Sequence, residues 1–231
     1  MNQTALIIGN SDGIGLGITE ALLERGWTIA GISKSPCQLK SKAYKHYIKD
    51  VTQSSFQNTL QKILNDHCPY LCIYCAGIGE PLDLENMKKE IDIVQVNLMG
   101  LVRTVTQVIP AMVKRGNGHF IGLSSVADVL LSSEAPSYHA SKAGFSNYLE
   151  GLGLALKQKG VYVTNIRFGF VDTKMAKGEI KPFMISVKKA TSHILKCLHK
   201  RPIRYTAPGI IVPMVNFRRF MMGLSLNRSV R

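Results

Sequence analysis

The sequence predicts a single α/β domain over residues 1–231, with a doubly wound parallel sheet and helices on both of its faces. Apolar runs at residues 4–8 and 27–32 indicate two strands, and Ile14 and Ile18 between them share one face of a helix. This strand–helix–strand order is typical of a parallel sheet. The length of 231 residues and the hydrophobic content of 45% suit one domain with its own core.

A glycine-rich turn joins the first expected strand to the first expected helix. It consists of Gly9, Asn10, Ser11, Asp12, Gly13, Ile14 and Gly15. Such a turn lets the backbone approach a pyrophosphate, and the free amides and dipole at the amino end of a helix favour the anion. The turn therefore predicts a Rossmann-type nucleotide site, and a plain tight turn stays open as the alternative.

The end of the second expected strand indicates which nucleotide is bound. An acidic residue at this place hydrogen-bonds the ribose of NAD, whereas a basic residue accommodates the 2′-phosphate of NADP. The sequence has Ser33 and Lys34 there, without a carboxylate to repel a phosphate and with one cation to pair with it. We therefore expect NADP(H) to be preferred and NAD(H) to remain usable, although Asp12 in the glycine turn acts against this preference.

A hydroxyl, a phenol and an amine occur together in the second half of the chain. Ser125 lies 13 residues before Tyr138, and Lys142 follows Tyr138 by four residues, which places the last two on one face of a helix. The pKa of a free tyrosine is about 10, and a neighbouring cation stabilises the phenolate. The pattern predicts acid–base chemistry at Tyr138.

Together with the glycine turn, these residues resemble the short-chain dehydrogenase/reductase family over nearly the whole chain. The resemblance implies that Tyr138 exchanges a proton with the substrate oxygen, while Lys142 lowers the pKa of Tyr138 and holds the nicotinamide ribose. It also implies that Ser125 hydrogen-bonds the reacting carbonyl and that Asn97 supports a water-mediated proton path. The hydride itself belongs to the cofactor.

The same resemblance implies contacts to the adenine, nicotinamide and phosphates of the cofactor from several loops. The residues concerned are Asp50, Val51, Ala76, Gly77, Gly169, Val171 and Thr173, together with Tyr138 and Lys142. Asp50 and Val51 match the adenine pair of the family, and Gly77 permits close approach of the backbone. Two asparagines that normally precede this glycine segment are replaced here, and Phe168 stands where relatives have a proline.

Further elements follow from apolar runs and helical spacing. We expect helices at residues 91–105 and 143–157, strands at residues 118–123 and 161–167, and a substrate loop at residues 174–190.

The five cysteines are expected to be reduced and to hold no metal. Cys72 and Cys75 fall on an expected buried strand, where cysteine usually behaves as a small hydrophobe. The sequence begins directly with an expected strand rather than a signal peptide, and a cytoplasmic location is therefore the expectation.

The net charge of +14 is unevenly distributed along the chain. From Lys174 onward there are 13 basic residues and a single acidic one, Glu179. Such a field attracts anions, including nucleic acid, acyl-carrier or coenzyme A thioesters, and phospholipid surfaces. No motif supports binding of nucleic acid, and a solvated basic face is the plainest alternative.

Residues 213–231 form a basic amphipathic segment. Its expected apolar stripe consists of Met214, Val215, Phe217, Phe220, Met221 and Leu224, flanked by arginines. The stripe can pack on its own domain or on a sister subunit as a lid, or it can lie on an anionic membrane. We expect the packed lid or subunit contact rather than the membrane contact.

These observations predict an NADP(H)-preferring oxidoreductase that interconverts a carbonyl and a secondary alcohol. A 3-oxoacyl thioester reductase of fatty-acid metabolism and a non-catalytic cofactor-binding regulatory protein are the alternatives. By the family resemblance, the protein is expected to form a homodimer or homotetramer.

Overall fold

The computed structural model describes residues 3–176 and 181–228. Its strands are β1 (Thr4–Ile8), β2 (Thr28–Ser33), β3 (Tyr44–Ile48), β4 (Leu71–Tyr74), β5 (Gly118–Ser125), β6 (Val161–Phe168) and β7 (Arg204–Ala207). Its helices are α1 (Gly13–Leu23), α2 (Ser54–His67), α3 (Lys88–Val94), η1 (Gln95–Met99), α4 (Gly100–Arg115), η2 (Val126–Val129), α5 (Pro136–Ala155), α6 (Val187–Lys200) and α7 (Ile211–Arg228).

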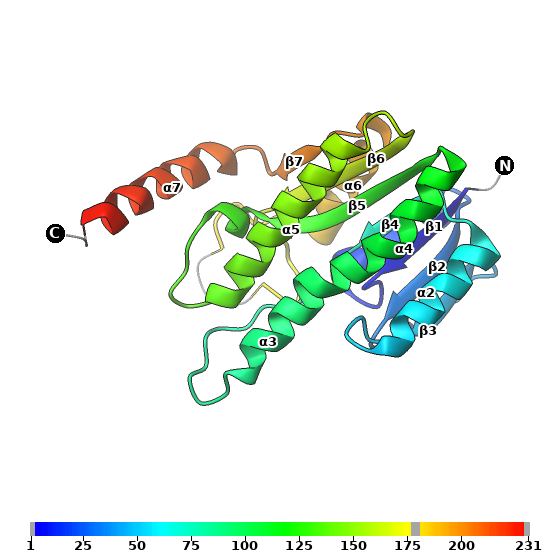
Figure 1. The fold of residues 1–231 in the computed structure, drawn as a ribbon, viewed down its shortest axis with the longest axis horizontal. Helices are drawn as coiled ribbons and strands as arrows, with labels where there is room; N and C mark the ends of the chain where they lie inside the picture. Colours follow the sequence, from blue (N-terminus) through cyan, green and yellow to red (C-terminus); the bar gives the residue numbers. More distant parts are fainter. Residues whose placement is uncertain (1–2, 177–180, 229–231) are drawn as a thin grey trace.

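The seven strands form one parallel sheet in the order β3-β2-β1-β4-β5-β6-β7, as Figure 1 shows. Helices α2, α4 and α5 cover one face, where Phe56, Val105 and Phe145 belong to one buried cluster. Helices α1 and α6 cover the other face, where Ile18 and Ile194 belong to a second cluster. The predicted doubly wound α/β sheet is therefore confirmed.

The order in which strands are added to the sheet reverses beside β1. The chain runs from β1 outward to β2 and β3, and it then returns to place β4 on the other side of β1. In such sheets a crevice opens outside the carboxyl ends of the strands at the reversal. The glycine turn follows β1 directly and therefore lies at this crevice.

One continuous helical stretch, Lys88–Arg115, contains the helix expected at residues 91–105. Its middle turn, η1, is a π-helix that carries Asn97. By length and composition alone this stretch could cross a membrane. Its buried side chains pack against the sheet, and this packing accounts for its apolar character.

Two expected boundaries were wrong. Helix α5 begins at Pro136 rather than at residue 143, because proline is well suited to the first turn of a helix, and it therefore also contains Tyr138 and Lys142. The segment expected to be a loop as far as residue 190 becomes helical at Val187, where Ser186 caps α6 by accepting a hydrogen bond from the N–H of Lys189. Residues 177–180 of that loop lie outside the described part of the chain.

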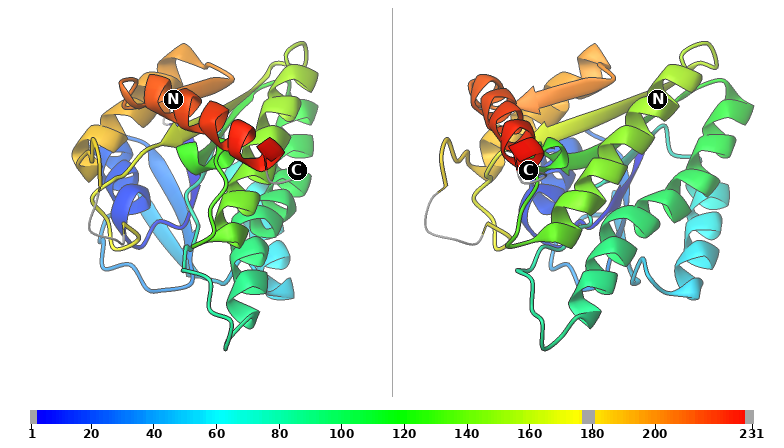
Figure 2. Two further views of the ribbon diagram at one scale, coloured as in Figure 1. Left: turned by 90° about the vertical axis from the view of Figure 1, so that its left-hand side faces the viewer. Right: turned by 60° about the vertical axis from the view of Figure 1, so that its left-hand side comes forward.

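Helix α7 extends beyond the sheet, as Figures 1 and 2 show. Of the expected apolar stripe, Val215 is buried, whereas Met214, Phe217, Phe220, Met221 and Leu224 are exposed. Most of the stripe is therefore not packed on its own domain, and the expected alternative, a contact with a sister subunit, stays a prediction. Ile211 and Val215 instead form the face that contacts the domain, and most of the expected stripe lies on the opposite face.

Candidate active site

The glycine turn forms a cradle at the carboxyl end of β1. Gly9 and Gly13 have φ angles of 84° and 53°, which favour glycine. A Cβ atom on Gly9 would collide with the backbone at Ala76, and one on Gly15 would collide with the carbonyl oxygen of Gly9. Only glycine therefore lets the turn pack this closely on itself and on the end of β4, and such a turn at the amino end of a helix fits close approach of a pyrophosphate.

Asn10, although part of the glycine turn, is fully buried. Its Nδ2 donates a hydrogen bond of 2.6 Å to the hydroxyl of Tyr44 on β3. The side chain therefore holds the turn to the sheet. Sequence reasoning missed Tyr44, because its partner lies 34 residues away along the chain. Ser11 is partly exposed, and Ile14 packs against the core cluster under α1.

The expected selector of the nucleotide lies at the carboxyl end of β2. Ser33 is buried, donates to the carbonyl oxygen of Ser35 at 2.7 Å and lies 3.3 Å from Nε2 of His46. Lys34 is exposed, and its Nζ lies 3.3 Å from Oδ2 of Asp50. The cation of Lys34 is therefore shared with the carboxylate at the expected adenine position.

Asp50 is held by its neighbours. Burial alone would raise its pKa, but hydrogen bonds from the N–H and hydroxyl of Thr52 and the ion pair with Lys34 together hold the pKa below its usual range. The next residue, Val51, is buried in the core cluster. Its side chain therefore supports this loop from inside.

The segment that follows β6, residues 172–174, faces the glycine cradle. A cavity of about 410 Å³ lies between them, lined by Asp12, Gly13, Leu16, Gly17, Glu20, Asp172, Thr173, Lys174 and Val187. A Cβ atom on Gly13 would lie 3.2 Å from Cγ2 of Thr173. Nζ of Lys174 lies 2.7 Å from Oδ2 of Asp12, and this contact, with the N–H of Gly13, lowers the pKa of Asp12.

Gly169 and Val171 position the segment that carries Thr173. The N–H of Gly169 donates to the carbonyl oxygen of Ala207 at 2.9 Å, and Val171 is buried and pairs with Ile185. These contacts fix the turn after β6 even though Phe168 replaces the proline of relatives. Of the residues predicted in this turn, Thr173 is thus brought to the glycine cradle, whereas Gly169 and Val171 support it from behind.

Asn97 is fully buried and fastens the loop that follows β4. Its Nδ2 donates to the carbonyl oxygen of Ile78 at 2.9 Å and to the hydroxyl of Ser141 at 3.0 Å, and its Oδ1 accepts from the N–H of Ile78 at 2.8 Å. Both of its amide hydrogens are therefore used within the protein. A Cβ atom on Gly77 would lie 3.4 Å from Oδ1 of Asn97 and 3.7 Å from Nζ of Lys142, which places this loop beside Lys142.

Lys142 is buried on α5, and its ammonium group donates to the carbonyl oxygen of Leu123 at 3.1 Å. Nζ also lies 4.9 Å from the ring centroid of Phe145 and 5.9 Å from that of Tyr138. Burial lowers the pKa of Lys142 to about 8, although the negative charge of Asp128 opposes this change. Lys142 is thus a desolvated cation whose pKa lies below its usual range.

Tyr138 lies one helical turn before Lys142. Burial raises the pKa of its phenol above the ordinary value of 10, and a hydrogen bond with Ser125 offsets part of this effect. Desolvation of the phenolate is therefore the largest influence on this pKa, and the expected lowering of the pKa by Lys142 stays a prediction. A Cβ atom on Gly79 would lie 3.1 Å from the ring of Tyr138, so the loop after β4 also reaches the phenol.

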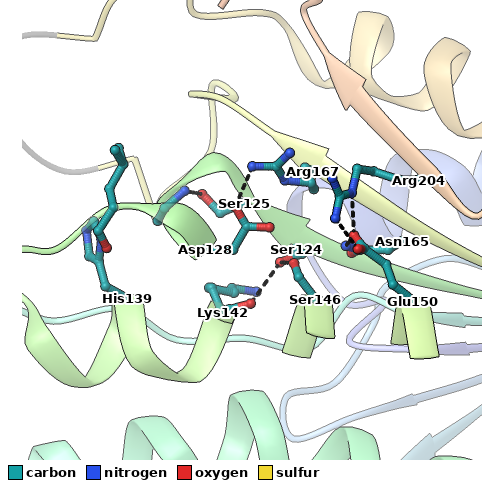
Figure 3. A network of polar contacts seen from close by, with 12 residues as sticks. Ser124, Ser125, Asp128, His139, Lys142, Ser146, Glu150, Asn165, Arg167 and Arg204 are labelled. Carbon is teal, nitrogen blue, oxygen red and sulfur yellow. Dashed lines mark hydrogen bonds and ion pairs between the residues drawn. The ribbon is translucent and has the colours of Figure 1, made fainter. Parts of the chain in front are cut away.

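Ser125 ends β5 and caps η2, since its hydroxyl accepts a hydrogen bond from the N–H of Ala127 at 3.2 Å. The preceding residue, Ser124, turns the other way and lies 2.8 Å from the hydroxyl of Ser146, as Figure 3 shows. Ser125 is thus the serine that shares the site with Tyr138.

A buried ion pair that sequence reasoning missed lies beside Ser125 (Figure 3). Nη2 of Arg167, at the end of β6, lies 2.6 Å from Oδ1 of Asp128 on η2, and both side chains are at most one-tenth exposed. The signal for it in the sequence was a charged residue at the end of an apolar strand. Asp128 contributes negative charge to the surroundings of both Tyr138 and Lys142.

No group of three His, Cys, Asp or Glu suited to a metal ion occurs in residues 3–176 and 181–228. Cys72 is buried, and burial raises the pKa of its thiol.

Comparison with known proteins identifies the family of this chain. The family model described as short chain dehydrogenase matches residues 3–182, and the chain therefore belongs to the short-chain dehydrogenase/reductase family of NAD(P)-binding oxidoreductases. The chain is 30% identical over 187 residues to 3-oxoacyl-[acyl-carrier-protein] reductase FabG of Vibrio harveyi, with 76% of each chain covered.

Solved structures show the same fold. A short chain dehydrogenase from Burkholderia cenocepacia in complex with NADP has a TM-score of 0.82 and 23% identity, covering 99% of this chain and 95% of its own. A 4-hydroxyisoleucine dehydrogenase complexed with NADH has a TM-score of 0.79 and 18% identity, covering 89% of this chain and 96% of its own. The two relatives hold different nucleotides, and the choice between NADP and NAD in this chain is therefore a matter for its own residues.

Proposed function

We propose that this protein is an NADP(H)-preferring oxidoreductase that interconverts a carbonyl and a secondary alcohol, with Tyr138 as its acid and base. The observation that carries the proposal is the grouping of Ser125, Tyr138 and Lys142 at the carboxyl edge of the sheet that also carries the glycine cradle. A bound nicotinamide cofactor would supply the hydride.

Each side chain of the group has a separate task. The hydroxyl of Ser125 donates to the carbonyl oxygen of the substrate, and the phenol of Tyr138 delivers the proton to that oxygen or removes it. Lys142 supplies a buried cation beside the phenol, and Asn97 holds the loop at Ile78 that encloses them. The cradle with Thr173 and Val171 would hold the cofactor phosphates and nicotinamide.

Replacement of Tyr138 by phenylalanine tests the proposed acid. Tyr138→Phe keeps the ring and removes the exchangeable proton, so turnover should fall by about 10²- to 10⁴-fold while affinity for NADPH changes by less than about twofold. Turnover is followed by oxidation of NADPH with a panel of ketones, aldehydes and acyl thioesters. Tyr148→Phe on the same helix is the matched control and should retain full activity. Near-normal turnover of Tyr138→Phe would show that another group is the acid.

The preference for NADP(H) is supported by Lys34, because a 2′-phosphate could replace the carboxylate of Asp50 as the partner of its ammonium group. Lys34→Ala should weaken binding of NADPH by about tenfold at low salt and leave binding of NADH nearly unchanged. Fluorescence titration with both nucleotides measures this difference, and the exposed Lys40→Ala serves as the control. Equal affinities of the unmodified protein for NADPH and NADH would contradict the proposal.

A 3-oxoacyl thioester substrate is the second candidate, supported by the 30% identity to the Vibrio harveyi reductase and by the charge of +14, which attracts an acidic carrier. The panel separates the two, because a thioester reductase would use acyl thioesters at far higher kcat/KM than simple ketones. A non-catalytic regulatory protein would bind NADPH without turnover on any member of the panel. The complete group of Ser125, Tyr138 and Lys142 favours an enzyme.

We further propose that residues 1–231 act as one domain, that residues 174–186 shape the substrate pocket, and that the protein is a homodimer or homotetramer. Light scattering of the purified protein measures the last of these.

A further inference from the structure

Helix α7 has two apolar faces rather than one. Ile211 and Val215 lie four residues apart and are buried against the domain, where Ile211 approaches Gly169 and the helix contacts η2. Phe217, Phe220 and Leu224 recur at intervals of three and four residues and therefore share one face. Met221, four residues after Phe217, belongs to this second face, and Met214 lies at its edge beside Ile211.

The second face is exposed to an unusual degree for such large apolar side chains. Phe217 and Phe220 are 66% and 64% exposed, and Met221 and Leu224 are also classed as exposed. Contiguous apolar surface of this kind normally marks a contact with another molecule or a membrane. In the described part of the chain, nothing packs over it.

The charges around this face indicate the chemistry of its partner. Arg218 and Arg219 are exposed and project to the two sides of the helix between its two apolar faces. The sequence contains no Asp or Glu after Glu179. A second copy of α7 laid against the first would therefore bring arginines together without a carboxylate between them, whereas an anionic surface would neutralise them.

We propose that the outer face of α7, formed by Met214, Phe217, Phe220, Met221 and Leu224, docks on an anionic phospholipid surface. The apolar side chains enter the boundary between headgroups and acyl chains, and Arg218 and Arg219 pair with lipid phosphates at either side. The helix lies in the interface and does not cross it. Because α7 contacts η2, which follows Ser125, docking holds the active-site edge of the sheet near the lipid.

Co-sedimentation of the full-length protein with vesicles tests the proposal. The protein should bind vesicles of phosphatidylcholine and phosphatidylglycerol and bind pure phosphatidylcholine vesicles far more weakly. Arg218→Gln with Arg219→Gln should weaken binding to the anionic vesicles by about thirtyfold, since each arginine near such a surface contributes about fivefold. Phe217→Ser with Phe220→Ser should weaken it by about tenfold or more.

The matched control is Ile48→Ser with Leu154→Ser, which removes two equally exposed apolar side chains elsewhere and should bind vesicles as the unmodified protein does. Affinity for NADPH should be the same in all variants, because none of these residues lies in the candidate active site. Unchanged vesicle binding after the Phe217 and Phe220 substitutions would overturn the proposal. Absence of vesicle binding by the unmodified protein would also overturn the proposal. The same holds if vesicle binding is absent and light scattering shows that these substitutions dissociate an oligomer.

Discussion

The buried charge of Lys142 should lower the free energy of unfolding of the protein, and Lys142→Met measures by how much. Lys142 is 5% exposed, and burial brings the pKa of its ammonium group from the ordinary 10.5 to about 8. That difference corresponds to about 3 kcal/mol at neutral pH. Methionine fills a similar volume without a charge. The hydrogen bond to the carbonyl oxygen of Leu123 is lost, however, and this loss reduces the gain in stability by about 1 kcal/mol. We expect Lys142→Met to be more stable by about 2 kcal/mol at pH 7.

The pH dependence has a definite sign. The folded protein releases the proton of Lys142 near pH 8 and the unfolded chain near pH 10.5, so between these values the unfolded state binds more protons and stability rises with pH. The extra stability of Lys142→Met over the unmodified protein should therefore be fully present below about pH 8 and disappear by about pH 10.

Thermal unfolding at a series of pH values is the assay. A gain of about 2 kcal/mol corresponds to a rise in Tm of roughly 4–8 °C for a chain of this length. The variant should at the same time lose turnover and bind NADPH more weakly. Lys157→Met, at an exposed position in the turn that follows the same helix, should leave Tm unchanged at every pH. A lower Tm for Lys142→Met at pH 7 would refute the reasoning.

Two further predictions concern buried charge. Asp128→Asn leaves the guanidinium of Arg167 buried without its counter-charge and should lower the free energy of unfolding, measured in urea, by about 3–5 kcal/mol. The double variant Asp128→Leu with Arg167→Met should recover most of this loss. Equal stability of the single and double variants would contradict this. His119 is fully buried, and burial lowers its pKa to about 3 from 6.5, so its contribution to stability is present above pH 6.5 and is lost as the pH falls toward 3. The stability of His119→Gln should consequently fall less between pH 6.5 and pH 4 than that of the unmodified protein, and parallel curves would show that another group causes the acid sensitivity.

Much of the fold and part of the site follow from local sequence. The apolar runs around Thr4–Ile8 and Thr28–Ser33 and the helical spacing between them predict parallel strands, and the structure confirms this sheet. The glycine turn could be predicted because strand, turn and helix are adjacent in the chain. The pair Tyr138 and Lys142 could be predicted for the same reason, since four residues on a helix fix a common face.

The partners of the side chains were decided by the tertiary structure. The ion pair of Asp128 with Arg167 joins residues 39 positions apart, and the bonds from Asn97 reach 19 and 44 positions along the chain. Such pairs depend on which strands become neighbours, and the periodicity of a single element contains no information on that order.

Burial likewise depends on the whole molecule. The sequence indicated a cation beside Tyr138, but only the packed chain shows how deeply both groups are enclosed, and this burial raises the pKa of Tyr138 and lowers that of Lys142. In α7 the sequence showed apolar residues at helical spacing, yet only the packed chain separates Val215, which faces the domain, from Phe217 and Phe220, which do not. Local sequence fixes the direction in which a side chain leaves its element, whereas the surroundings that it meets, and with them its charge state and exposure, are set by segments that fold against it from elsewhere in the chain.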